Sequence, residues 1–170
     1  MILLNKMDMK SFDDNVFQAY TYIEKDHGGS GVKGFDFLKL VKMLAVEYPP
    51  EVVHGLLRQL YKREDEPVEF EEFLSGVKTV LLYDNYFEEM EVLFKHLDVT
   101  KKGVVSKEDL LEAVRKLKNE EIAPQHELRV PNAEDLDAIL TSSAVEENTQ
   151  INYDEFLVAL YKATLENLGE

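Results

Sequence analysis

A short pattern that recurs four times constrains the fold of this 170-residue chain more than any other feature. Each copy has a β-branched residue, an acidic residue four positions later, and then an apolar residue that opens a helical stripe. Successive copies lie 36, 37 and 46 residues apart. They are Val32…Asp36-Phe37, Val68…Glu72-Phe73, Val105…Asp109-Leu110 and Ile151…Glu155-Phe156. Repeats of this length indicate one supersecondary unit that stacks on its neighbours.

Apolar residues at helical spacing flank every copy on both sides. Gaps of three and four residues place them on one face of a helix. The stripes before the copies are Phe12-Val16-Tyr20-Ile23, Val53-Leu57-Leu60, Met90-Phe94-Leu97 and Leu136-Leu140. A unit with a single apolar face cannot bury that face alone, so the copies should pair. The sequence therefore predicts an all-α protein of four helix–loop–helix units, paired into two lobes at residues 1–84 and 85–170.

Capping and turn residues suggest where these helices begin. Proline is favoured in the first turn of a helix, and Ser, Asp and Asn are favoured just before it. The predicted helix starts are Ser11, Pro50 after Pro49, Asp84 or Asn85, and Asn132. The longer third interval is explained by residues 118–131, which we interpret as an exposed linker. The β-branched residues at the loop centres are expected to form backbone bridges, Val32 with Val68 and Val105 with Ile151.

This pattern resembles the EF-hand superfamily, in the four-hand arrangement of calmodulin and the myosin light chains. The resemblance runs from about Phe12 to about Ala163. Its strongest segments are 94–110, which has Gly103 at the sixth loop position, and 150–156, which is similar to the last hand of calmodulin. The third and fourth hands are also similar to the EF-hand subunit of the ciliary nexin–dynein regulatory complex. The resemblance implies loops at about 24–36, 61–72, 98–109 and 144–155.

Calcium coordination requires six or more oxygen ligands and a sharp turn within such a loop. The first loop is longer than the standard twelve residues, and its carboxylates do not have the standard spacing. In the second loop Tyr61 and Arg63 occupy coordinating positions, and in the fourth Ala144 removes the first ligand. These three loops therefore lack a complete ligand set.

The third loop is closest to the calcium-binding pattern. Its candidate ligands are Asp98, Thr100, Ser106 and Asp109. Lys102, however, occupies the fifth position and would bring a positive charge close to the ion. We therefore predict no metal site of normal affinity and no cofactor, with these four residues as the candidates should calcium bind.

The charge of the chain restricts the classes of partner that it could bind. It has 34 acidic and 19 basic residues and a net charge of −15, which argues against binding to nucleic acid or to an anionic membrane. The chain contains no cysteine, and its four histidines lie far apart. No nucleophile, phosphate-binding or dinucleotide motif is present, so we expect no enzymatic activity. Residues 85–170 carry 19 acidic and 9 basic residues, which favours a basic amphipathic helix as the partner of that half.

The expected function is that of a non-catalytic, calcium-independent light chain or adaptor for a larger assembly. The sequence has no signal-peptide core and no apolar run of membrane-spanning length, so we expect a cytoplasmic protein. The resemblance implies the cytoskeleton, a motor or the ciliary axoneme as its setting. The predicted partner groove consists of Phe94, Leu97, Leu110, Val114, Leu140, Phe156 and Leu160. Two alternatives remain, a calcium-responsive sensor with one or two variant sites and a regulatory subunit of an enzyme.

Overall fold

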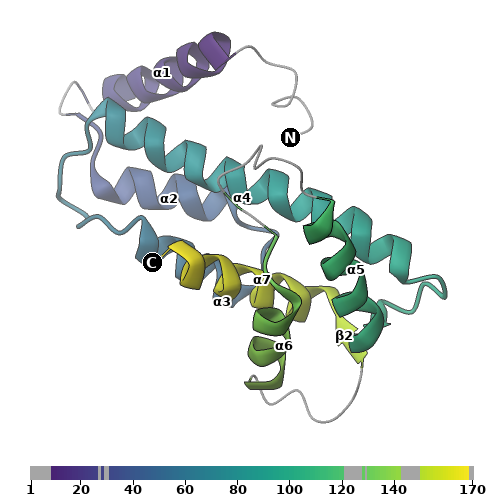
Figure 1. The fold of residues 1–170 in the computed structure, drawn as a ribbon. Coiled ribbons are helices and arrows are strands. Elements are labelled where there is room, and N and C mark those ends of the chain that lie inside the picture. The colour runs from purple at the N-terminus through teal and green to yellow at the C-terminus, as the bar shows by residue number, and fades with distance from the viewer. Residues whose placement is uncertain are drawn as a thin grey trace. The chain divides into compact units, whose positions relative to one another are not determined.

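The computed structural model describes residues 9–26, 28, 31–120, 128, 130–142 and 150–168, and within them the chain is mostly helical, as predicted (Figure 1). The described elements are α1 (Met9–Asp26), α2 (Gly34–Leu44), α3 (Pro50–Gln59), α4 (Phe70–Leu97), β1 (Val104–Ser106), α5 (Lys107–Asn119), α6 (Ala133–Ser142), β2 (Gln150–Asn152) and α7 (Tyr153–Leu168). None of the described helices combines the length and the apolar character that a membrane span requires.

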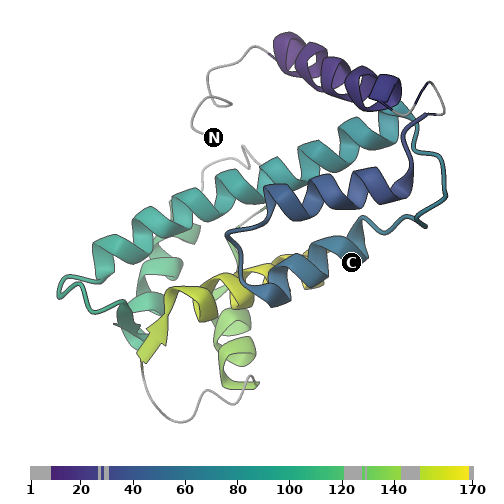
Figure 2. The ribbon, with the colours of Figure 1, turned by 180° about the vertical axis from the view of Figure 1, so that it is seen from behind.

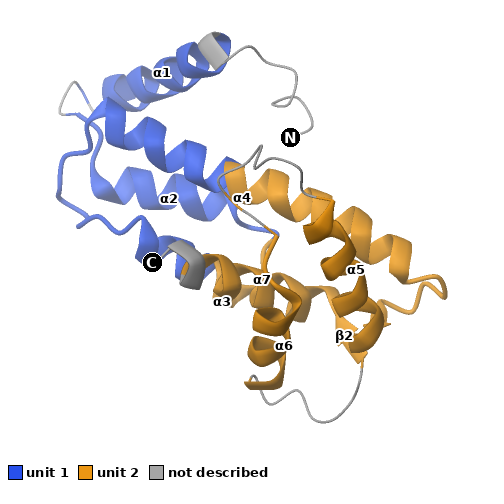
Figure 3. Ribbon diagram, in the orientation of Figure 1, with its two compact units in different colours: residues 1–47, 53–81 blue, residues 48–52, 82–170 orange. Residues whose placement is uncertain are grey.

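The chain divides into two compact units, coloured separately in Figure 3. Unit 1 comprises residues 1–47 and 53–81, and unit 2 comprises residues 48–52 and 82–170. Helices α3 and α4 each contribute residues to both units. The division within α4, between Leu81 and Leu82, lies three residues before the end of the predicted lobe 1–84.

Helix α4 runs without interruption for 28 residues, so the prediction that a new helix begins at Asp84 or Asn85 was wrong. The segment contains no proline to break it. The Asp84 carboxylate instead accepts a hydrogen bond of 2.8 Å from the Tyr48 hydroxyl. The acidic side chain that resembled a helix cap therefore makes a tertiary contact within unit 2.

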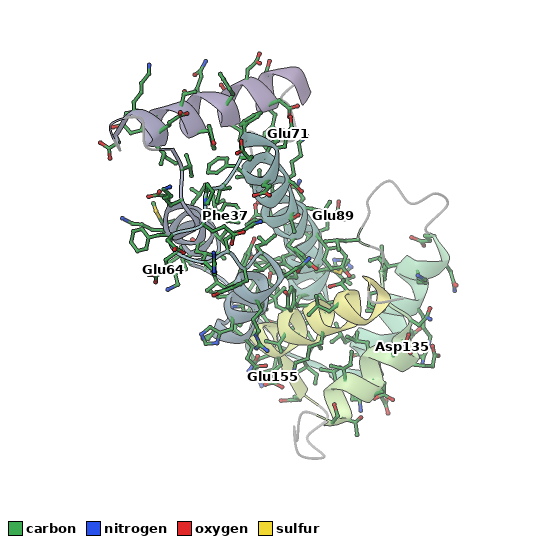
Figure 4. All side chains as sticks on the ribbon, turned by 90° about the vertical axis from the view of Figure 1, so that its left-hand side faces the viewer. Phe37, Glu64, Glu71, Glu89, Asp135 and Glu155 are labelled. Atoms are coloured by element: carbon green, nitrogen blue, oxygen red, sulfur yellow. The ribbon has the colours of Figure 1, made fainter. Side chains whose placement is uncertain are left out.

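Unit 1 is organised around a bridge between the segments that precede α2 and α4. The Val68 amide donates to the Val32 carbonyl at 2.9 Å, and the Gly34 amide donates to the Glu66 carbonyl at 2.8 Å. This confirms the predicted pairing of Val32 with Val68. Phe37, labelled in Figure 4, is 2 % exposed and lies against the ring of Phe73, with a centroid distance of 6.0 Å.

Unit 2 contains the antiparallel pair β1–β2, in which Val105 lies opposite Ile151 as predicted. Helices begin directly after both strands. Ser106 caps α5 by accepting from the Asp109 amide at 3.1 Å, and Asn152 accepts from the Glu155 amide at 2.8 Å at the start of α7. The two strands thus place equivalent strand-to-helix turns at the two opposite ends of the antiparallel pair.

Two further predictions, one about a helix start and one about a buried stripe, need correction. Ser11 lies inside α1 and does not begin it, because α1 already includes Met9. In α3 the buried residues are Val52 and Leu56, one position before the predicted stripe.

The interpretation of residues 118–131 as an exposed linker was also wrong in part. Helix α5 continues to Asn119, and Leu128 and Val130 are buried. The Lys118 ammonium donates to the Val130 carbonyl at 2.7 Å. The described end of the segment is therefore held against unit 2 by apolar contacts and by this hydrogen bond.

Candidate functional site

The third loop, between α4 and β1, is closed by its own hydrogen bonds. The Asp98 carboxylate accepts from the amides of Lys102 at 3.1 Å and Gly103 at 2.9 Å. Two residues take the left-handed conformation that this turn needs, Lys101 with φ 55° and Gly103 with φ 79°. For a non-glycine residue such as Lys101 that conformation is uncommon, and the amide contacts of Asp98 hold it in place.

The other candidate ligands of this loop are exposed or engaged in a helix cap. The Ser106 hydroxyl is engaged by the Asp109 amide, and Thr100 and Asp109 are exposed. In the described part of the chain no three His, Cys, Asp or Glu side chains are grouped so that they could hold a metal ion. The absence of a calcium site of normal affinity stays a prediction.

Of the remaining loops, the second has an ion pair at its last ligand position, and the first and fourth lie partly outside the described residues. In the second loop the Lys62 ammonium lies 3.2 Å from the Glu72 carboxylate, so a protein cation occupies the neighbourhood of the last ligand position. In the fourth loop Ala144 and residues 146–149 lie outside the described residues, as do residues 27, 29 and 30 of the first.

Replacing Asp98 by alanine should cost stability even without calcium. The variant loses the acceptor for two loop amides, so we expect a loss of about 1 kcal/mol in the free energy of unfolding, measured by urea denaturation in chelator. Thr100→Ala is the matched control and should change it by less than about 0.5 kcal/mol. At about 1 mM calcium, far above what sensor hands need, the wild-type stability should not rise. A calcium-dependent gain that Asp98→Ala abolishes would show that the loop binds the ion.

The seven residues of the predicted partner groove all lie in unit 2, but six of them are buried. Those six are at most 4 % exposed and fill its core: Phe94, Leu110, Val114, Leu140, Phe156 and Leu160. Leu97 is half-buried at the end of α4. Contact between a partner and the buried six stays a prediction.

A groove of about 390 Å³ lies between the end of α4 and α5, and Leu97 lines it. The other half-buried apolar residues of its lining are Leu93, Ala113 and Leu117. The charged and polar residues around them are His96, Asp109, Glu112, Lys116 and Glu120. The groove therefore offers an apolar floor with a predominantly anionic rim, within one unit of the structure.

Sequence reasoning did not include Leu93 and Leu117 in the site. Leu93 lies four residues before Leu97 and Leu117 lies three residues after Val114, each at the edge of the apolar face of its helix. That spacing is the signal that could have identified them. Whether such an edge residue is buried or left in a groove depends on how the two helices cross, which the spacing does not specify.

Elsewhere in unit 2, burial, hydrogen bonds and an ion pair shift the pKa values of several titratable groups. Burial, together with the Asp84 hydrogen bond, raises the pKa of the Tyr48 phenol, and burial raises that of Tyr153. A hydrogen bond from the Lys107 ammonium lowers the pKa of the Asp137 carboxyl. These shifts follow from structural contacts and do not identify a general acid or base near a cavity.

Residues 1–166 match the family described as "Tubulin polyglutamylase complex subunit 1-like, C-terminal". The chain belongs to this family. It is also 23% identical, over 100 residues, to an uncharacterized calcium-binding protein of Caenorhabditis elegans. That match covers 59% of this chain and 52% of the relative, so the chain spans about half the length of the curated relative it matches.

Membership of this family has two consequences for the chain. The family is named for a complex subunit, so protein partners are part of its description. The name also associates the family with the cytoskeleton. The EF-hand character of the four helix–loop–helix repeats is part of the function that we propose.

Proposed function

We propose that this chain is a non-catalytic, EF-hand-like adaptor that holds a basic amphipathic helix of a partner protein within a cytoskeletal assembly. The observation that carries the proposal is the groove between α4 and α5. Its four apolar residues suit the apolar face of a helix, and its rim has three carboxylates and one ammonium group. Calcium is not required, because the third loop already satisfies Asp98 with backbone amides.

The charge around this groove favours a basic partner over an acidic one. Residues 85–170, which contain the groove, carry 19 acidic and 9 basic residues, and such a surface attracts cationic segments and repels anionic ones. Polyglutamylation, by its chemistry, adds glutamate residues and makes the modified segment more anionic. We therefore propose that the groove binds another subunit of the assembly and not the modified tail.

The family description supports an assembly that modifies tubulin as the setting. In such a complex the chain would act as a regulatory or connecting subunit, while a different subunit carries the catalytic groups. The ciliary axoneme remains the specific location we propose within the cytoskeleton.

The test is recovery of partners from cell extract by the wild-type chain and by a groove variant. Leu97→Glu places a charge on the apolar floor and should reduce recovery of the bound helix-containing partner at least about tenfold. Val92→Glu is the matched control, because Val92 lies on the same helix, is 70 % exposed and does not line the groove. Recovery should be unchanged by chelator. Equal recovery by both variants would contradict the proposal.

A calcium-responsive sensor is the second candidate, favoured by the description of the Caenorhabditis elegans relative as a calcium-binding protein. It predicts heat of binding at micromolar calcium by titration calorimetry, with chemical shift changes confined to the third or fourth loop. An absence of both signals would leave the calcium-independent adaptor.

A further inference from the structure

Helix α2, the dark blue helix in Figure 2, has exposed residues along one side. They are Phe35, Lys39, Lys42 and Met43, and the exposed Val46 follows just after the helix. Helical spacing places the four residues of α2 within an arc of roughly 100°. The opposite face, with Gly34, Phe37 and Val41, is buried in unit 1. The helix therefore has one face in the core and a second, ordered face in solvent.

The apolar content of this exposed face is high. Phe35 is 56 % exposed, Met43 65 % and Val46 76 %. Single exposed apolar residues need no explanation, but two on one helical face, with a third just beyond the end of the helix, are the kind of grouping that marks protein contacts. Methionine is also well suited to a contact surface because its side chain adapts its shape.

Two lysines lie on this face of a strongly acidic chain, with the exposed Glu47 and Glu64 at its margins. Lys39 and Lys42 are exposed, and no ion pair involves either of them within the residues that the structure describes. Two other lysines of unit 1 are paired, Lys62 with Glu72 and Lys78 with Asp13, each at 3.2 Å. The acidic residue nearest to this face on α2, Asp36, accepts a hydrogen bond from the Lys33 amide and caps the helix.

We propose that this face of α2 is a second docking surface, which binds an acidic amphipathic segment of a partner protein. The segment would place apolar side chains against Phe35, Met43 and Val46, and carboxylates beside Lys39 and Lys42. A bilayer does not fit as the ligand, because an extended anionic surface would face the whole chain of net charge −15, whereas a short segment meets mainly the charges within about a Debye length of this face. The proposal does not depend on the α4–α5 groove, which fits a ligand of the opposite charge.

The probe for this surface is a synthetic helical peptide of leucine, alanine and glutamate, with a leucine face flanked by glutamates. Binding is measured by fluorescence anisotropy in chelator, and the contact surface by amide chemical shift changes. Wild-type chain should bind the peptide with shift changes concentrated in residues 35–46. The double variant Lys39→Glu/Lys42→Glu should bind about tenfold more weakly, because each charge reversal turns an attraction into a repulsion. Met43→Ser should weaken binding independently through the apolar contact.

A matched control separates this face from general electrostatics. Lys101→Glu/Lys102→Glu changes the net charge equally, at two exposed lysines in the third loop, and should leave the affinity within about twofold. No binding of the peptide, shift changes elsewhere, or equal weakening by both double variants would overturn the proposal. So would self-association in sedimentation velocity that only Lys39→Glu/Lys42→Glu abolishes, since the face would then bind a second copy of the chain.

Discussion

Replacing Phe156 by alanine is expected to lower the free energy of unfolding by about 3–5 kcal/mol, among the largest losses for any single substitution in this chain. Phe156 is 0 % exposed on α7, and its ring is stacked on that of Phe94 with a centroid distance of 6.1 Å. The deletion removes the buried ring and leaves a cavity that rigid neighbours cannot fill. Urea denaturation followed by circular dichroism measures the change.

The matched control is Phe35→Ala, which removes the same ring from a side chain that is 56 % exposed. Its expected effect on the free energy of unfolding is below about 0.5 kcal/mol. A loss below about 1 kcal/mol for Phe156→Ala would contradict the assignment of Phe156 to the core and would reopen the interpretation of this residue as part of an open partner groove.

The repeat allowed the pairing of the loops within each compact unit to be predicted in detail. Val105 was expected opposite Ile151 and lies there, because a β-branched residue at a loop centre both favours extended backbone and buries its side chain. The stripes were also informative, since a 3.6-residue period leaves little freedom in which face of a helix is buried.

Other features depend on contacts between distant residues and could not be predicted from local patterns. An aspartate in the sequence is equally able to cap a helix or to accept a tertiary hydrogen bond. Only the position of Tyr48 decides this for Asp84. Similarly, Leu128 and Val130 stand in a polar, proline-containing segment, yet both are buried.

The candidate site likewise depends on contacts that local sequence patterns do not specify. Composition indicated that the C-terminal half would attract a basic helix, and spacing identified its apolar residues. Spacing could not separate Phe94, which fills the core, from Leu93, which lines the groove, although the two are adjacent on α4. That difference arises from the position of α5 beside the last turns of α4.

Replacing Gly34 by alanine is expected to cost about 3 kcal/mol or more in the free energy of unfolding and to separate the paired loops of unit 1. A Cβ atom at this position would lie 2.0 Å from the Arg63 carbonyl oxygen, which belongs to the backbone and cannot rotate away. Moving apart by the required distance would break the bond from the Gly34 amide to the Glu66 carbonyl and weaken the adjacent Val32–Val68 bridge. Hydrogen exchange of the Val68 amide should accelerate together with the loss of stability.

Gly31→Ala serves as the control for this prediction because it separates steric overlap from backbone strain. Gly31 has φ 86°, and no atom lies within 4 Å of an added Cβ, so the expected loss is only the left-handed penalty of about 1–2 kcal/mol. Gly34 has an ordinary helical position, and its loss must come from overlap alone. Equal stability of Gly34→Ala and wild type would mean that the Arg63 carbonyl is not held against α2, and that the two loops of unit 1 pair less closely than the Val32–Val68 bond implies.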